Sequence, residues 1–372
     1  MLFGSLFSGI GGFDLGFARA GLDCAWQVEW DLDCQAVLAR HFPGVKRFSD
    51  VRTVTGRTGK GWRRYGQLRA VDVLTGGFPC QDLSVAGDRR GLDGERSGLW
   101  FEFYRLIVEL RPRLVVIENV PGLLSSAGGQ DFAVILAGLS GVLPDIPKGG
   151  WKNSGFGRGL FYNVAWRVLD SQYFGIPQRR RRVYIVASLG SGCSAEILLE
   201  PESVLRYPPP RRETPQEAPV VAGTLSANRG GMERPAGNAN ELDFCIPVAN
   251  TLGGGSGQRG WCNDLDRAGA FIPVAFGGGN SAEIDVATTL STKNQRIDFE
   301  SETFLAATPG VRRLMPVECE RLQGFPDGWT EYAGPDLFAW KQTDGRRYRQ
   351  LGNAVSVPVA EWLGHRIKTY LR

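Results

Sequence analysis

Cys80 is the side chain in this sequence that is best placed to act as a nucleophile. It follows Gly77-Phe78-Pro79 and an apolar run from Val71 to Leu74 that is typical of a buried strand. Pro79 cannot donate a backbone hydrogen bond, and its ring stiffens the turn that presents the thiol. Ligands bind at the carboxyl ends of strands in open α/β sheets, so a thiol there is a candidate for covalent catalysis. A buried cysteine that acts as a small apolar side chain is the alternative.

Two further polar clusters follow predicted strands. Glu118 comes directly after the buried-strand pattern at 114–117, so its carboxyl is a candidate proton donor. Arg180 and Arg182 belong to a run of arginines that leads into another apolar strand pattern. On one face of such a strand, their guanidinium groups can hold a base carbonyl, a phosphate or the Glu118 carboxylate. A purely structural ion pair with an arginine is the alternative for Glu118.

A glycine-rich loop near the N-terminus is typical of a nucleotide site. Gly9 and Gly11 stand between a predicted strand and a predicted helix, where glycine lets a ligand approach the backbone. Glu29 ends the second predicted strand, at the place where an acid binds ribose hydroxyls. Trp30 beside it can stack on a purine ring, and Asp50 can receive the adenine amino group at a third strand end. A tight strand–helix turn without a ligand also needs glycine, which is the alternative.

Composition limits the class of protein. The chain has 372 residues, 42% of them hydrophobic and 22% charged, which suits a globular protein with two domains. No apolar run is long enough to span a bilayer, and the N-terminus lacks a signal-peptide pattern. Seven cysteines without a CxxC pair indicate reduced thiols, so we expect a cytoplasmic location. With only two histidines, the sequence predicts neither a metal site nor histidine-based catalysis.

The basic residues are clustered although the net charge is only +4. The stretch 52–69 holds six basic residues and no acid, and 179–182 is an unbroken run of arginine. Clustered cations on a nearly neutral chain indicate a local surface for a polyanion. A solvated face is the alternative for 52–69.

The elements that must position these residues follow an α/β pattern over 1–188, where apolar runs alternate with helix-like stretches and predict a parallel sheet. Residues 190–310 are instead rich in Gly, Asn, Ser and Pro, and show no helix of convincing length. Near copies of Val-Ala-x-Thr-Leu recur there at 221–225, 248–252 and 286–290. The predicted strands are 2–7, 26–29, 71–74, 114–117 and 182–187, and helical pattern falls at 13–20, 317–323 and 357–370.

Six strings together resemble the DNA cytosine-5 methyltransferase family. They are LFSGIGGFDLGF (6–17), GGFPCQDLS (76–84), ENV (118–120), QRRRRVYIV (178–186), RRLMPVECERLQGFPDGW (312–329) and GNAVSVPV (352–359). Their order and spacing are those of the family. The resemblance implies an α/β fold with a Rossmann-like, mostly parallel sheet in a catalytic domain at 1–189 and 350–372. It further implies a smaller, irregular β-rich target-recognition domain at 190–311 and a hinge segment at 312–349 that packs between the two.

The resemblance also implies a reaction. Cytosine is flipped out of duplex DNA, Cys80 adds to C6, and C5 takes a methyl group from S-adenosylmethionine. Glu118 acts at N3, while Arg180 and Arg182 hold the cytosine O2 and orient Glu118. The cofactor-contacting positions, with those of the glycine loop, are Phe7, Gly9, Gly11, Glu29, Trp30, Asp50, Pro79, Leu99 and Asn353. The DNA-contacting positions are Gln81, Ser84 and Arg96.

The expected partner is double-stranded DNA, bound by a monomer in a bacterial or phage-infected cell. A cognate restriction endonuclease would be a functional rather than a physical partner. Two alternatives stay open. A tRNA-methylating branch of the family has the same core, although it lacks a large variable domain. A catalytically silent, sequence-specific DNA-binding protein is the other, and the intact trio Cys80, Glu118 and Arg182 argues against it. The stretch 52–69 either extends the DNA contact or is a surface loop.

Overall fold

A computed structural model describes most of the chain outside the central segment. The described residues are 1–57, 66–79, 98–190, 192–199, 274–276, 304–307, 310–335 and 338–371. Cys80, Gln81, Ser84 and Arg96 lie outside them, as do the Val-Ala-x-Thr-Leu copies. The chain divides into two compact units, a larger one of residues 1–205, 289–294 and 316–372 and a smaller one of 206–288 and 295–315. The predicted domain boundaries stay predictions.

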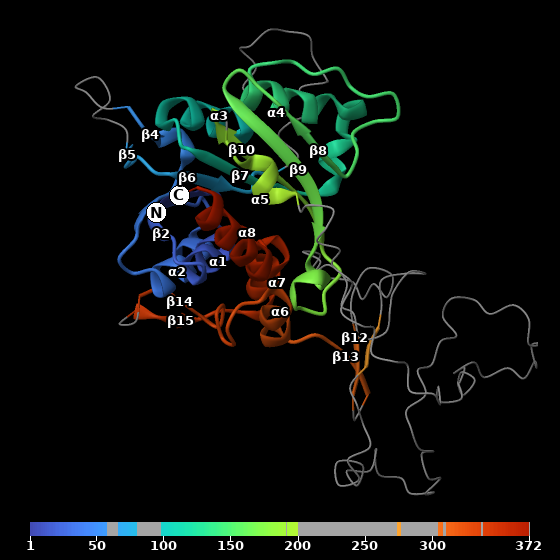
Figure 1. Ribbon diagram of the computed structural model, residues 1–372. Coiled ribbons are helices and arrows are strands. Elements are labelled where there is room, and N and C mark those ends of the chain that lie inside the picture. Colours follow the sequence, from blue (N-terminus) through green and yellow to red (C-terminus); the bar gives the residue numbers. More distant parts are fainter. Residues whose placement is uncertain are drawn as a thin grey trace, which may run out of the picture. The chain divides into compact units, whose positions relative to one another are not determined.

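An eight-stranded sheet forms the centre of the larger unit (Figure 1), in the order β3-β2-β1-β6-β7-β10-β9-β8. The first five strands in this order are parallel, and each of the last three runs antiparallel to its neighbour. The predicted α/β fold with a mostly parallel sheet is confirmed. The strands are β1 Leu2–Leu6, β2 Asp23–Val28, β3 Lys46–Phe48, β6 Val73–Gly76, β7 Leu114–Asn119, β8 Ser154–Gly157, β9 Tyr162–Asp170 and β10 Arg181–Leu189.

The late strand expected at 182–187 exists as β10, but it runs antiparallel to β7, so a wholly parallel sheet of βαβ units is wrong at this edge. The connection from β9 to β10 explains the difference. It covers only 171–180 and contains one turn of 3₁₀ helix, Ser171–Phe174. A parallel pair needs a crossover of a dozen or more residues, usually a helix, whereas a short connection returns the chain antiparallel.

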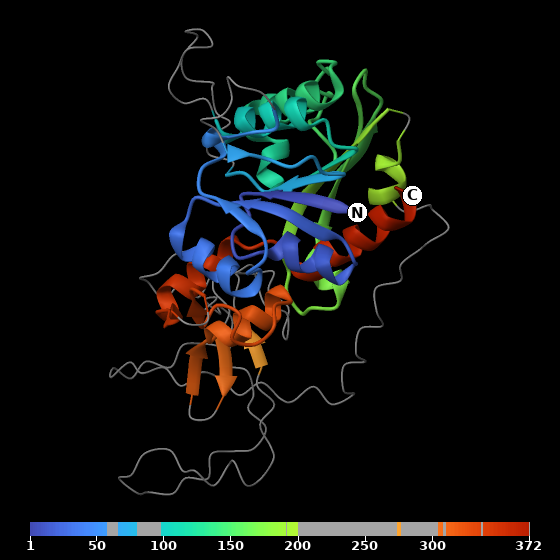
Figure 2. The ribbon, with the colours of Figure 1, turned by 90° about the vertical axis from the view of Figure 1, so that its left-hand side faces the viewer.

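Helices cover both faces of the sheet (Figure 2), and β7 shows why. Its alternate side chains Val115 and Ile117 pack in one apolar cluster with α3 and α4, and Leu114 and Val116 pack in another with α1 and α8. This is the two-residue period of a strand buried on both faces. The helices are α1 Gly12–Arg19, α2 Leu32–His41, α3 Leu99–Leu110, α4 Gln130–Ser140, α5 Ser194–Leu198, α6 Pro316–Gln323, α7 Asp344–Asn353 and α8 Val357–Tyr370.

The C-terminal segment packs closely on the N-terminal helix. A Cβ atom at Gly16 of α1 would lie 2.6 Å from the Ala360 Cβ of α8, and one at Gly364 would lie 2.7 Å from the Ala20 Cβ. Glycine at both crossings lets the two helices approach to near backbone contact. Residues 316–372 thereby become part of the larger unit although the whole variable segment precedes them in sequence.

The remaining described elements are small. Strands β11 Val274–Phe276, β12 Phe304–Ala307 and β13 Gly310–Arg313 form an antiparallel sheet in the smaller unit. In the larger unit, β4 Val54–Thr55 pairs with β5 Gly66–Gln67, and β14 Tyr332–Ala333 pairs with β15 Trp340–Lys341. None of the helices in the described ranges is sufficiently long and apolar to cross a membrane.

Asp14 of α1 is a fully buried acid, and we expect it to make the free energy of unfolding depend on pH. Its carboxyl accepts hydrogen bonds from Ser5 Oγ at 2.9 Å and Gln27 Nε2 at 2.8 Å. Burial raises the pKa of this carboxyl, against the smaller opposing effect of these hydrogen bonds. A raised folded-state pKa means that the folded chain binds the proton more tightly than the unfolded chain. The stabilisation is therefore present below the ordinary aspartate pKa and is lost as pH rises through the folded value.

We expect Asp14→Asn to flatten this pH dependence. The free energy of unfolding of the wild type should fall with rising pH by up to about 1.4 kcal/mol per pH unit, the limit for one proton. The variant carries a neutral amide at every pH and should lose that slope. Urea unfolding of both proteins between pH 4 and 8 measures it. Identical slopes would mean that Asp14 is already ionised in the folded protein throughout this range.

Candidate active site

A cleft of about 700 Å³ opens at the carboxyl ends of the parallel strands. Strands β1, β2, β3, β6 and β7 all end at this edge, which is where open α/β sheets bind ligands. The cleft brings together residues that are as far apart in sequence as Phe7 and Asn353. The predicted site residues that line it are Phe7, Gly9, Glu29, Trp30, Asp50, Pro79, Leu99, Glu118, Arg180, Arg182 and Asn353.

Glu29 joins the glycine loop to the residue before α2 through hydrogen bonds. Its carboxylate accepts a hydrogen bond from the Gly9 backbone N–H at 2.7 Å and another from the Asp31 N–H at 2.8 Å. Burial raises the pKa of the Glu29 carboxyl, and the two backbone donors partly offset the effect. Gly9 takes a left-handed φ of 55°, and a Cβ there would meet no atom within 4 Å, so the loop leaves open space. Gly11 instead caps the N-terminus of α1 with a φ of 89°.

Aromatic and acidic groups complete this half of the cleft. Trp30 leaves 71% of its surface exposed, an unusual state for tryptophan that keeps its ring available for stacking. Asp50 caps a 3₁₀ turn through the Arg52 N–H at 2.9 Å. Phe7 has a φ of 52°, which is rare for a residue with a side chain and carries a strain of about 1–3 kcal/mol. In this conformation the Phe7 ring lies beside the Phe103 ring of α3, with ring centroids 6.2 Å apart.

The other half of the cleft holds a carboxylate–guanidinium pair. Glu118 is the last residue but one of β7, and its Oε1 atom lies 3.1 Å from the Nε atom of Arg182 on β10. A Cβ atom at Gly77 would lie 2.9 Å from the second oxygen of Glu118, so the turn after β6 approaches this carboxylate closely because residue 77 has no side chain. The pair therefore stands beside the turn that leads to Cys80.

Arg180 lies just before β10 and has different partners. Its Nη2 atom donates to the Gly352 carbonyl at 3.1 Å and to the Ala354 carbonyl at 2.7 Å, while Nε and Nη1 find no acceptor among the described residues. Burial, and then the like charge of Arg182, lower the pKa of Arg180 to about 10. Arg180 thus ties the chemical half of the cleft to the segment that carries Asn353.

The described thiols are poor nucleophiles. Burial raises the pKa of each of them above the ordinary cysteine value, in the case of Cys319 to about 12. Cys34 lines the cleft, but it is buried beside the acids Glu29 and Asp31, which raise its pKa further. Because the thiolate is the reactive species, a raised pKa lowers the reactivity of these cysteines. They are Cys24, Cys34, Cys193 and Cys319.

Sequence reasoning missed two residues of the site. Asn119 follows Glu118, and its amide donates to the Phe78 carbonyl at 3.0 Å, which holds the turn before Pro79 against β7. The position of Asn119 in the Glu-Asn-Val string, directly after Glu118, could have identified it as a site residue. Arg349 lines the cleft from α7 and lies 3.5 Å from the Asp33 carboxylate of α2. No local pattern could pair positions so distant in sequence, because only the return of the C-terminal segment brings them together.

Gly12, which follows the glycine loop, packs so closely on the C-terminal segment that a side chain at this position should destabilise the fold. A Cβ atom there would lie 2.3 Å from the backbone carbonyl oxygen of Val355. Gly12→Ala must therefore push the C-terminal segment away from α1, and we expect a loss of about 1–3 kcal/mol in the free energy of unfolding. Gly44→Ala is the matched control, since a Cβ at Gly44 would meet nothing within 4 Å. Urea unfolding compares the two, and equal stabilities would contradict the contact.

Known proteins resemble this chain over nearly its whole length. A protein of Escherichia phage P1 named DNA N-6-adenine-methyltransferase is 31% identical over 99% of this chain, which spans 61% of that relative's length. The Type II methyltransferase M2.BsuMI of Bacillus subtilis strain 168 is 30% identical over 98% of this chain and 74% of the relative. The crystal structure of the S. pombe Dnmt2 methyltransferase shares the fold, with a TM-score of 0.56 at 16% identity over 99% of both chains.

The sequence profile of the C-5 cytosine-specific DNA methylase family matches residues 1–146 and 152–369. This match confirms the family that the six strings indicated, and with it the predicted class of enzyme, a DNA cytosine-5 methyltransferase. The adenine in the phage P1 relative's name describes that longer protein. The chain belongs to the C-5 cytosine-specific DNA methylase family.

Proposed function

We propose that this chain binds S-adenosylmethionine in the cleft and methylates C5 of a cytosine that is flipped out of double-stranded DNA. The observation that carries the proposal is the convergence of two groups of residues on one cleft. The loop and strand-end residues suited to a nucleoside line one half, and the Glu118–Arg182 pair lines the other, beside the turn that ends at Pro79.

The residues of the cleft fit this cofactor. A volume of about 700 Å³ lies within the range of small-molecule sites. Glu29 and Asp50 offer carboxylates at strand ends for hydroxyl and amino groups, and the exposed Trp30 ring offers a stacking surface. The cofactor, which methyltransferases of this family generally use, supplies an electrophilic methyl group on its sulfonium. The residues proposed to hold it are Phe7, Gly9, Glu29, Trp30, Asp50, Leu99 and Asn353.

The resemblance to the family supports the following chemical roles, and the Glu118–Arg182 pair is consistent with them. The Cys80 thiolate forms a bond to C6 of the cytosine, and Glu118 donates a proton or hydrogen bond to N3, so that electron density moves to C5. Arg182 holds the Glu118 carboxyl at 3.1 Å in the orientation that this step needs. Once C5 has taken the methyl group and S-adenosylhomocysteine is left, the C5 proton would pass to solvent water and the freed electron pair would expel Cys80 as thiolate. Return of the N3 proton to Glu118 would restore the enzyme.

The DNA contacts are proposed from the sequence. The target base must leave the helix before Cys80 can reach C6. Gln81 would fill the space left by the base, while Ser84 and Arg96 would contact phosphates. The segment 190–311 would select the methylated sequence by contacts to base edges, and the basic stretch 52–69 would extend the contact with the DNA backbone. The proposed enzyme acts as a monomer and needs no metal.

Base-resolution cytosine methylation after incubation with S-adenosylmethionine tests the proposal. Unmethylated DNA and an unmodified tRNA pool are offered in parallel to the purified chain. We expect 5-methylcytosine in DNA within one short sequence and none in tRNA. Methylation of tRNA alone would overturn the choice of substrate. Sequence-specific DNA binding without any methylation would instead support a catalytically silent binding protein.

A further inference from the structure

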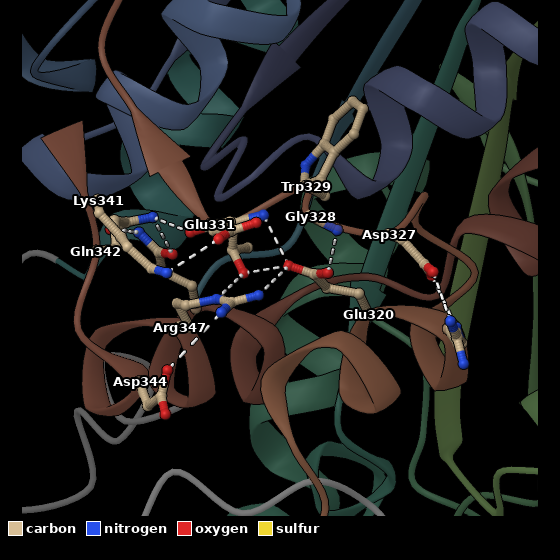
Figure 3. A network of polar contacts seen from close by, with 12 residues as sticks. Glu320, Asp327, Gly328, Trp329, Glu331, Lys341, Gln342, Asp344 and Arg347 are labelled. Atoms are coloured by element: carbon tan, nitrogen blue, oxygen red, sulfur yellow. Dashed lines mark hydrogen bonds and ion pairs between the residues drawn. The ribbon is translucent and has the colours of Figure 1, made fainter. Parts of the chain in front are cut away.

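The buried carboxylate of Glu320 organises the C-terminal segment (Figure 3). This side chain of α6 has no exposed surface, yet its oxygens are fully engaged. One oxygen accepts from the Gly328 N–H at 2.7 Å, and the other accepts from the Thr330 N–H at 2.8 Å and from Arg347 Nη2 at 3.0 Å. The carboxylate therefore holds the backbone on both sides of Trp329. A buried charge is stable only with such complete pairing.

Trp329 connects the segment held by Glu320 to the glycine loop. Its indole Nε1–H donates to the Ile10 carbonyl at 2.9 Å, and Ile10 stands between the two glycines of the loop. The indole ring is stacked on His41 at a centroid distance of 3.5 Å and an interplanar angle of 6°. The imidazole Nε2 of His41 also lies 2.7 Å from the Trp329 carbonyl oxygen. Trp329 is thus fixed by its own neighbours, and it in turn fixes the Ile10 carbonyl.

The same network reaches a second part of the cleft lining through α7. Arg347 lies on this helix, and so does Gln350, whose amide exchanges hydrogen bonds with Gln342 at 3.1 Å. Gln342 also donates to the Thr330 carbonyl at 2.8 Å. Helix α7 ends at Asn353, and the cleft is lined by Gln350, Gly352 and Asn353. One buried cluster therefore supports two parts of the cleft lining that come from opposite ends of the sequence.

We propose that Glu320 and Trp329 are positioning residues for the cofactor. Neither lines the cleft, but together they hold the glycine loop and the end of α7 in the arrangement that receives S-adenosylmethionine. A loop that is ordered before binding loses less conformational entropy on binding, so affinity depends on these residues although they do not touch the ligand. The inference rests on the proposed function, in which this cleft takes S-adenosylmethionine.

Trp329→Phe tests the inference with little change in packing. Phenylalanine keeps an aromatic ring on His41 but lacks the N–H donor, so the Ile10 carbonyl loses its partner. We expect the Kd of S-adenosylhomocysteine, measured by calorimetry, to rise about tenfold. The KM for S-adenosylmethionine should rise by a similar factor, with kcat at saturation within about twofold. Glu320→Gln places an amide against the Gly328 and Thr330 N–H groups, and it should raise Kd and KM in the same way.

Arg321→Gln is the matched control. Arg321 follows Glu320 on α6, but its ion pair with Asp327 is exposed, so its loss should leave both constants unchanged. If Trp329→Phe binds S-adenosylhomocysteine as tightly as the wild type, the inference is overturned. A lower kcat with unchanged KM would overturn it equally, because it would assign Trp329 to the chemical step. A wild type that binds neither S-adenosyl compound would instead refute the proposed function, and this inference with it.

Discussion

Cys80→Ser is expected to lower the rate of methyl transfer by at least about three orders of magnitude while folding and cofactor affinity stay intact. The reason is the ionisation of the nucleophile. A thiol has an ordinary pKa near 8.5, so a fraction of it is thiolate at neutral pH, and the thiolate is the reactive species. A serine hydroxyl in the same place stays protonated and cannot add to C6 at a useful rate. Single-turnover methylation of a DNA that contains the target sequence measures the effect.

Cys34→Ser is the matched control for this prediction. Cys34 lines the same cleft, but burial and neighbouring acids raise the pKa of its thiol, which disfavours the reactive thiolate. Its replacement should change the transfer rate by less than about threefold. Calorimetry with S-adenosylhomocysteine shows in each variant whether the cleft is still formed. A Cys80→Ser protein that methylates at the wild-type rate would remove the covalent step from the mechanism.

Glu118→Gln is expected to lower kcat about 10²- to 10⁴-fold, the usual contribution of a positioned proton donor. Glutamine has the shape of glutamate and can still accept a hydrogen bond from Arg182, which now contacts the carboxylate at 3.1 Å. What it cannot do is deliver a proton to N3 of the cytosine. The KM for S-adenosylmethionine should therefore change by less than about threefold, since Glu118 belongs to the chemical half of the cleft.

Glu331→Gln provides the comparison. Glu331 also forms an ion pair at 3.1 Å, with Lys341, but on the β14–β15 side of the larger unit and away from the residues that line the cleft. The kcat of the Glu331→Gln variant should match that of the wild type. If Glu118→Gln keeps wild-type turnover, N3 is activated by another group, and the role of the Glu118–Arg182 pair is structural, as the alternative interpretation of this acid held.

Much of the sheet could be predicted because its strands carry their own signal. The pattern at 114–117 predicted β7, and the pattern at 71–74 predicted β6 within two residues. The helix pattern at 357–370 coincides with α8. Helix α7 gave no such signal, because Leu351 is the only large apolar side chain on its buried face, which otherwise consists of Arg347, Gln350 and Gly352. The burial of these polar groups depends on partners elsewhere in the chain, such as Glu320 and Gln342.

The sequence by itself determined the local features on which the proposed chemistry rests: a cysteine after a buried strand, an acid near the end of β7, arginines just before and at the start of β10, and glycines after β1. These features are local, because strand periodicity and turn residues depend only on neighbours in the chain. The tertiary structure decided which partners each group has. It joins Arg182 to Glu118, Arg180 to the Gly352 and Ala354 carbonyls, and Trp329 to Ile10. Hydrogen bonds between such distant positions form only after the two ends of the chain have packed together, so no local pattern encodes them.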